Sequence, residues 1–297
     1  MDKIYSGFLR RKNGAVSFVD ANGKNILQDC AIWSGYTEHW MGKALLAKKL
    51  PQKDYVSGKN MMIMWPDEAF SEGPYTDIYY NERLVKYPAS LLGHLAININ
   101  GSIFNFSHLI NENEIISPAE YFYRPALGEF APHPLLNRFN VEDGEKPYYD
   151  KFGRRFMRSI HVLRVYGLDT DRLHRFFNSY LEMIKSTPPD PARPHKYRDF
   201  SVLSRSCSTI IRDGLNESGY SVKGIFPRDV FVSAALRLTR IERTGKIKIQ
   251  IFKMSQLKVR EAPYSKPSPL INPANRIRLM ILKKIKPEIS FLLLENR

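Results

Sequence analysis

The sequence has few cysteines and no long apolar run, and each of these absences bears on the class of protein. Its two cysteines, Cys30 and Cys207, lie far apart in 297 residues. A disulfide between them is one alternative, but a reducing compartment favours two buried or reactive thiols. No run approaches the roughly 20 apolar residues of a membrane-spanning helix. The basic residues Arg10 to Lys12 are not followed by an apolar stretch, so we expect a protein made in the bacterial cytoplasm without a cleaved signal peptide.

The sequence also lacks the motifs of the common metal, nucleotide and serine enzymes. It contains no His-Glu-x-x-His, no paired Cys-x-x-Cys, no phosphate-binding Gly-x-x-x-x-Gly-Lys and no Gly-x-Ser-x-Gly. Five histidines are scattered without the spacing of metal ligands: His39, His133, His161, His174 and His195. We therefore expect neither a metal nor another cofactor.

Acidic residues are scarce relative to basic ones. The chain has 30 Asp and Glu against 45 Lys and Arg, which gives a net charge of +15. Most of this excess lies from Arg240 onward, where 14 Lys and Arg stand against four Glu. Such a segment can bind a polyanionic surface such as a cell wall, acidic lipid, nucleic acid or an acidic partner. A solvated basic face explains the charge equally well.

One stretch, residues 204–215, predicts a helix with a cysteine at its start. Ser206 can cap the helix, Cys207 falls in the first turn, and Gly219 is placed to end it. Apolar residues recur at helical spacing, at Ile210, Ile211 and Leu215. Unpaired backbone N–H groups at a helix N-terminus favour the thiolate form of cysteine, which is the nucleophile.

A histidine that could serve this cysteine as a base lies in a predicted hairpin. Asn100-Gly101 between two alternating apolar runs is the strongest short-range hairpin signal, because both turn positions need a positive φ. This turn sets Ile99 opposite Ser102, and therefore Ala96 opposite Asn105. His94, Asn105 and Ser107 then share one face of the hairpin.

Elsewhere the sequence predicts a mixture of helices and strands. Hydrophobic residues make up 43% of the chain and aromatic residues 12%, as in globular proteins. Strands are expected at 15–19, 26–27, 61–65, 156–168 and 246–252. Helices are expected at 37–50, 117–123, 228–238 and 276–286, and from a cap at Asp169 onward. A long loop is expected at 124–149 and a linker at 263–273.

The order of these features resembles one known family. Gly93-His94 opens the hairpin, and Ser206-Cys207-Ser208-Thr209 opens a helix much later in the chain. This layout is similar to the circularly permuted papain-like cysteine hydrolases, which include NlpC-like cell-wall peptidases and relatives of lecithin retinol acyltransferase. In them the histidine strand precedes the cysteine helix, the reverse of papain. The resemblance covers roughly residues 60 to 240 and departs from the family at Ser206, where many relatives have Asn.

The resemblance implies a fold and a set of site residues. It implies an α+β fold in which a central antiparallel sheet packs against the cysteine helix, with extensions at both ends. The ranges are an N-terminal extension at 1–60, a catalytic domain at 61–240 and a basic C-terminal extension at 241–297. Cys207 would be the nucleophile and His94 the base. Asn105 fits the third, orienting position by its face, and Ser107 and His108 are the alternatives.

The function that follows is that of a cysteine hydrolase with an acyl-enzyme intermediate, cleaving amide bonds of peptides or peptidoglycan. A basic protein without a leader that resembles wall hydrolases further suggests an exported antibacterial or host-directed effector. Its partners would then include a secretion machinery or an immunity protein. The first alternative is a lipid acyl hydrolase or acyltransferase of the same fold. The second is a non-enzymatic protein that binds nucleic acid through its basic C-terminal region, although nucleic acid is the less favoured partner.

Overall fold

The computed structural model divides the chain into two compact units. The first comprises Met1–Glu72, Pro118–Ser159 and Lys253–Ser265, and the second Gly73–Ser117, Ile160–Phe252 and Lys266–Arg297. Each unit thus draws on separate parts of the chain, and the division differs from the expected ranges 1–60, 61–240 and 241–297. The structure describes residues 3–32, 40–53, 57–67, 73–85, 90–123, 125–127, 142–143, 146–147, 149–153, 158–256 and 265–287.

The first unit is built on a six-stranded sheet with the strand order β3-β2-β1-β5-β6-β4. Its strands are β1 (Ile4–Lys12), β2 (Ala15–Val19), β3 (Asn25–Ile26), β4 (Cys30–Ala31), β5 (Ala44–Lys53) and β6 (Asn60–Pro66). The strands expected at 15–19 and 26–27 are found as β2 and β3, which pair with each other, and the strand expected at 61–65 is found as β6. The helix expected at 37–50 is wrong from residue 44 onward. There the chain pairs with β1 and β6 and buries Leu45 and Ala47 at the period of two that marks a strand.

Shorter elements complete this unit. They are α2 (Pro118–Tyr123), β12 (Pro125–Leu127), β13 (Glu142–Asp143), β14 (Lys146–Pro147) and β15 (Tyr149–Gly153). The short helix expected at 117–123 is therefore confirmed. Within the range 124–149, expected as a loop, the described residues form short strands, and the other residues of that range lie outside the described part of the chain.

The second unit contains a six-stranded sheet with the order β11-β10-β9-β7-β16-β17. Its strands are β7 (Tyr75–Asn81), β9 (His94–Ile99), β10 (Ser102–Asn105), β11 (Glu114–Ile116), β16 (Ile160–Tyr166) and β17 (Lys248–Met254). The pairs β7–β9, β9–β10, β10–β11 and β7–β16 are antiparallel. A turn of 3-10 helix, η3 (Ile110–Glu112), precedes β11, and two short strands, β8 (Arg83–Leu84) and β18 (Ser265–Lys266), lie outside this sheet.

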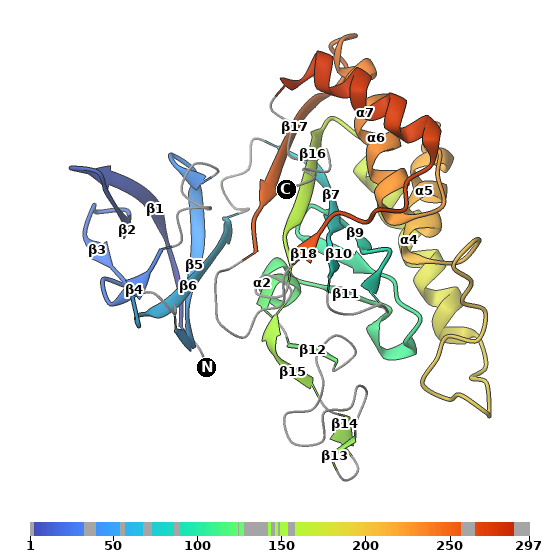
Figure 1. Ribbon diagram of the computed structural model, residues 1–297, viewed down its shortest axis with the longest axis horizontal. Helices are drawn as coiled ribbons and strands as arrows, with labels where there is room; N and C mark the ends of the chain where they lie inside the picture. Colours follow the sequence, from blue (N-terminus) through green and yellow to red (C-terminus); the bar gives the residue numbers. More distant parts are fainter. Residues whose placement is uncertain are drawn as a thin grey trace. The chain divides into compact units, whose positions relative to one another are not determined.

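Helices of the second unit lie beside this sheet (Figure 1). They are α4 (Thr170–Ser186), α5 (Cys207–Glu217), α6 (Pro227–Glu242) and α7 (Pro273–Ile285). Helices α4, α5 and α6 all contact β9, and a shared apolar core joins the helices to the strands. The predicted cap of α4 is confirmed, because Asp169 Oδ1 accepts the N–H of Arg172 at 2.9 Å. The second unit is therefore a sheet-and-helix layer, and the chain as a whole is α+β.

Among the described residues, no helix combines the length and the apolar character needed to cross a bilayer.

Candidate functional site

Helix α5 begins at Cys207, as the sequence predicted. Ser206 is the N-cap: its Oγ accepts the N–H of Thr209 at 3.4 Å, and the N–H of Ser206 donates to Thr209 Oγ1 at 2.8 Å. This reciprocal capping box uses two of the donors that a helix start leaves open. The helix ends at Glu217, and Gly219 follows with φ +89°. Local sequence therefore places the cysteine in the first turn of the helix.

The hairpin that carries His94 also has the predicted register. Asn100 and Gly101 both adopt positive φ, at +50° and +91°, and Ser102 pairs with Ile99 and Asn105 with Ala96. His94 is thus the first residue of β9. Before it, Gly93 has φ +74°, and a Cβ at this position would lie 2.4 Å from the carbonyl oxygen of Asn81. Only glycine lets the chain pass this close to β7 as it enters the strand.

His94 and Asn105 meet through their side chains. His94 Nε2 lies 2.8 Å from Asn105 Oδ1, and Asn105 Nδ2 donates to the carbonyl of Glu112 at 2.7 Å. The Glu112 carbonyl can only accept, so it fixes which end of the Asn105 amide faces His94. Oδ1 in turn can only accept, so Nε2 must carry the proton. In the neutral ring Nδ1 is then the basic nitrogen.

The two alternative third residues have other contacts. Strand β10 ends at Asn105, and Ser107, beyond the strand, bonds through its backbone N–H to Asn113 Oδ1 at 3.0 Å. The ring of His108 packs edge-on against Phe200, with 5.7 Å between ring centroids. The structure therefore brings Asn105 to His94, as the face argument predicted.

The thiol of Cys207 lies against β9. Cys207 is half-buried, and a hydrogen bond from the backbone N–H of Leu95, the residue after His94, lowers its pKa. The backbone N–H groups of Ser208 and Cys207 act in the same direction. The effect of desolvation is larger than that of the three hydrogen bonds together, and the pKa of the thiol rises to about 11. The N–H groups at the helix start therefore favour the thiolate, as expected, but burial outweighs them and leaves the pKa of the thiol above its ordinary value.

The second cysteine belongs to the first unit. Cys30 is 7% exposed, and burial raises the pKa of its thiol to about 11. Both cysteines are free. This burial fits the expectation of a buried thiol at Cys30.

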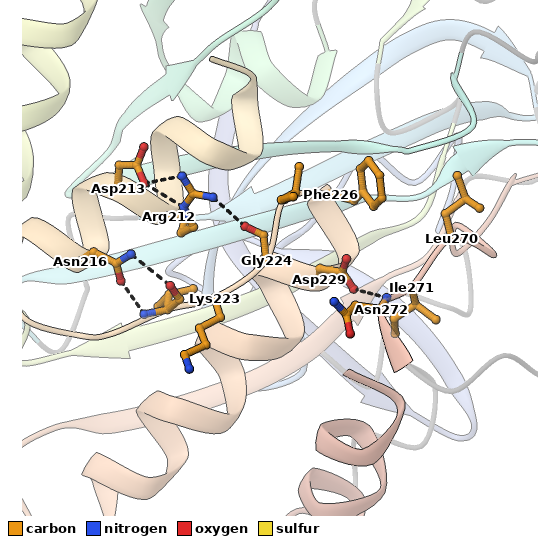
Figure 2. Close-up of a pocket in the computed structure, with 12 residues that line it drawn as sticks. Arg212, Asp213, Asn216, Lys223, Gly224, Phe226, Asp229, Leu270, Ile271 and Asn272 are labelled. Carbon is orange, nitrogen blue, oxygen red and sulfur yellow. Dashed lines mark hydrogen bonds and ion pairs between the residues drawn. The ribbon is translucent and has the colours of Figure 1, made fainter. Parts of the chain in front are cut away.

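An open pocket of about 740 Å³ lies beside α5, as Figure 2 shows. It is lined by α5, residues 222–226, the start of α6 and residues 270–272. Arg212 forms an ion pair with Asp213 at 2.7 Å and donates to the carbonyl of Gly224 at 2.9 Å. On the other side of the pocket, Asp229 accepts the N–H of Asn272 at 2.9 Å. Sequence reasoning did not identify this pocket, because its walls come from segments that are separate in the sequence.

The pocket is tied directly to the first turn of the cysteine helix. Ser208 Oγ donates to the carbonyl of Ile225, whose side chain is 38% exposed and lines the pocket. Cys207, His94 and Asn105 are not among the residues that line this pocket.

The described residues contain no group of three or more His, Cys, Asp or Glu side chains placed to hold a metal ion. Comparison of the chain with protein-family models, with curated proteins and with solved structures found no match.

Proposed function

We propose that this protein is a cysteine hydrolase of the permuted papain-like type, acting on amide bonds of peptides or peptidoglycan. One observation carries the proposal: a cysteine in the first turn of a capped helix receives a hydrogen bond from Leu95, adjacent to a histidine whose tautomer is fixed by an asparagine. Cys207, His94 and Asn105 can thus act as nucleophile, base and orienting residue. The antiparallel sheet beside the cysteine helix supports the same fold type.

The raised pKa of Cys207 favours one of two forms of this mechanism. A resting thiolate–imidazolium pair would need a depressed thiol pKa, whereas burial raises it to about 11. His94 Nδ1 therefore takes the thiol proton as Sγ attacks the carbonyl carbon, which is general-base catalysis. The N–H groups of Leu95, Ser208 and Cys207 stabilise the negative sulfur as it forms.

The remaining steps form the acyl-enzyme, release the amine and then hydrolyse the thioester. The S–C bond forms, the carbonyl oxygen becomes an oxyanion, and the N–H of Cys207 at the helix start is its donor. His94 returns the proton to the amine as the C–N bond breaks, which leaves a thioester on Cys207. Water attacks the thioester as His94 takes a proton from it. The C–S bond then breaks, the carboxylic acid product leaves, and His94 returns the proton to the sulfur, which regenerates the thiol.

Peptidoglycan is the favoured substrate because the chain is strongly basic. A net charge of +15 concentrates the protein on an anionic cell wall. In this proposal the protein is an effector delivered to a target cell, with a secretion machinery or an immunity protein as its partners.

The test is to trap the acyl-enzyme. The purified protein is incubated with peptidoglycan and with peptide libraries, and Cys207 is searched by mass spectrometry for an added acyl group. Cys207→Ala should release no product, His94→Ala should lose 10²–10⁴-fold in rate, and Cys30→Ser should behave as the parent. Product release that persists in Cys207→Ala would contradict the proposal.

A second candidate is acyl transfer or hydrolysis on lipids, which the outer face of α7 favours. Ile277 and Met280 are each 56% exposed, and the helix has four basic residues and no acidic one. Such a face suits an anionic lipid surface. Sedimentation with anionic vesicles, and release of fatty acid from them that requires Cys207, would favour this candidate. An Ile277→Ser, Met280→Ser variant that binds vesicles like the parent would contradict it.

A further inference from the structure

The buried side chain of Asn113 makes several hydrogen bonds to the backbone of the segment between β10 and β11. Asn113 is 3% exposed and is the residue before β11. Its Oδ1 accepts the N–H of Ser107 at 3.0 Å, and its Nδ2 donates to the carbonyls of Ser107 at 3.0 Å and Leu109 at 2.7 Å. A longer contact, at 3.4 Å, reaches the carbonyl of Ile110. The Asn113 amide thus bonds the backbone of the connection on both sides of the turn. Residues 195–197 support the connection from outside, since Ile110 N–H donates to the carbonyl of His195 at 2.9 Å and Tyr197 N–H to that of His108 at 2.8 Å.

This connection contains the carbonyl that accepts a hydrogen bond from Asn105 Nδ2. Residues Ile110–Glu112 form the 3-10 turn η3, and the N–H of Asn113 closes it on Ile110 O at 3.2 Å. The last carbonyl of the turn, that of Glu112, accepts from Asn105 Nδ2 at 2.7 Å. The position of this carbonyl thus depends on the turn that Asn113 holds.

We infer that Asn113 is a positioning residue for His94, acting through Glu112 and Asn105. Asn113 fixes the turn, the turn presents the Glu112 carbonyl, and that carbonyl keeps Asn105 Oδ1 toward His94 Nε2. The catalytic meaning of this relay rests on the proposed function. The tautomer of His94 that this relay selects does not depend on the proposed function.

The energetic reason lies in the symmetry of an amide. Without the Glu112 carbonyl, Asn105 could rotate and present Nδ2 to His94 with little loss. Nε2 would then accept and Nδ1 would carry the proton, so Nδ1 could no longer act as a base. A relaxed turn would in this way leave the His94 ring in place but with its proton on the nitrogen that must act as the base.

The test reads the ring nitrogens of His94 directly. Protein labelled with ¹⁵N-histidine is studied by NMR at a pH where the ring is neutral, and His94→Gln identifies its signals among those of the seven histidines. The parent should show a protonated Nε2 and an unprotonated Nδ1. In Asn113→Ala the two nitrogen shifts should move toward each other as the tautomers mix.

Asn98→Ala is the matched control. Asn98 is fully buried in the same hairpin and bonds Tyr79 Oη at 3.0 Å and the N–H of Gly101 at 2.8 Å. Its loss should destabilise the unit but leave the His94 shifts at their parental values. Parental shifts in Asn113→Ala, or equal changes in both variants, would overturn the inference.

Failure of the proposed function would look different. A parent with a protonated Nε2 that never forms an acyl-enzyme contradicts the hydrolase and leaves the positioning role intact. If Asn113→Ala does not fold, Asn113→Asp serves, since its carboxylate keeps the acceptor and removes the amide donor. A parent ring with its proton on Nδ1 overturns the inference without any variant.

Discussion

At the scale of single residues, the thiol of Cys207 is set by two opposing effects. Three backbone N–H groups favour the thiolate, and burial disfavours it more strongly, so its pKa rises to about 11. A helix start alone therefore does not make a reactive cysteine. In the proposed mechanism His94 must therefore remove the thiol proton at the moment when the sulfur attacks.

We expect Cys207 to be alkylated slowly near neutral pH. An ordinary thiol has a pKa near 8.5, so a pKa of about 11 lowers the thiolate fraction at pH 7.5 on the order of 100-fold. The iodoacetamide rate at Cys207, measured in Cys30→Ser from pH 6 to 11, should keep rising through pH 10. The denatured chain supplies the ordinary titration as the control. A rate that levels off near pH 9 in the folded protein would contradict the raised pKa.

Gly93 gives a second prediction at this scale. Alanine at this position meets both a positive φ and the carbonyl of Asn81, 2.4 Å from its Cβ, so the entry to β9 must shift. Gly219 is the matched control, because its φ is also positive while nothing lies within 4 Å of a Cβ there. Gly219→Ala should cost about 1 kcal/mol in free energy of unfolding. Gly93→Ala should cost more and should also shift the ring signals of His94; equal costs would show that the close approach is unimportant.

At the scale of elements, the capping box determines where the cysteine helix begins. Ser206→Ala removes the acceptor for Thr209 N–H and should lower the free energy of unfolding by about 1 kcal/mol. Thermal unfolding measures this loss. Ser204→Ala, two residues earlier and exposed, should leave the midpoint unchanged. An unaltered midpoint in Ser206→Ala would mean that packing alone fixes the start of the helix.

The hairpin and the cysteine helix were predictable because each is specified by a few adjacent residues. Asn100-Gly101 fixed the register of β9 and β10, and Ser206 fixed the start of α5. The strand β5 was mispredicted as a helix because its pairing partners, β1 and β6, are distant in sequence. The hydrogen bonds of Asn113 and the burial of the Cys207 thiol have no local sequence signal, because both depend on contacts between residues that are distant in the sequence.

At the scale of the whole molecule, the two thiols with raised pKa values make the free energy of unfolding depend on pH in the alkaline range. Both folded-state pKa values are about 11, above the unfolded value near 8.5. The folded state therefore binds more protons between these values, and the free energy of unfolding falls as pH rises from about 8.5 toward 11. Each thiol contributes roughly 3 kcal/mol to this loss at 1.36 kcal/mol per pKa unit.

Denaturant unfolding at pH 8 and pH 10.5 measures this loss. Cys207→Ala and Cys30→Ala should each flatten the dependence on pH, whatever they do to stability at pH 8. A parental slope in both variants would assign the alkaline loss to other groups.

The interleaving of the two units limits how the protein can be divided. A fragment that stopped at residue 240 would lack β17 and α7 and would leave β16 as the outer strand of its sheet. An uncovered strand edge is a template for pairing with other molecules. Because the first unit also takes a segment from residues 253–265, neither unit can be transplanted as one contiguous module. Such a truncated chain should therefore self-associate rather than yield an independent catalytic domain.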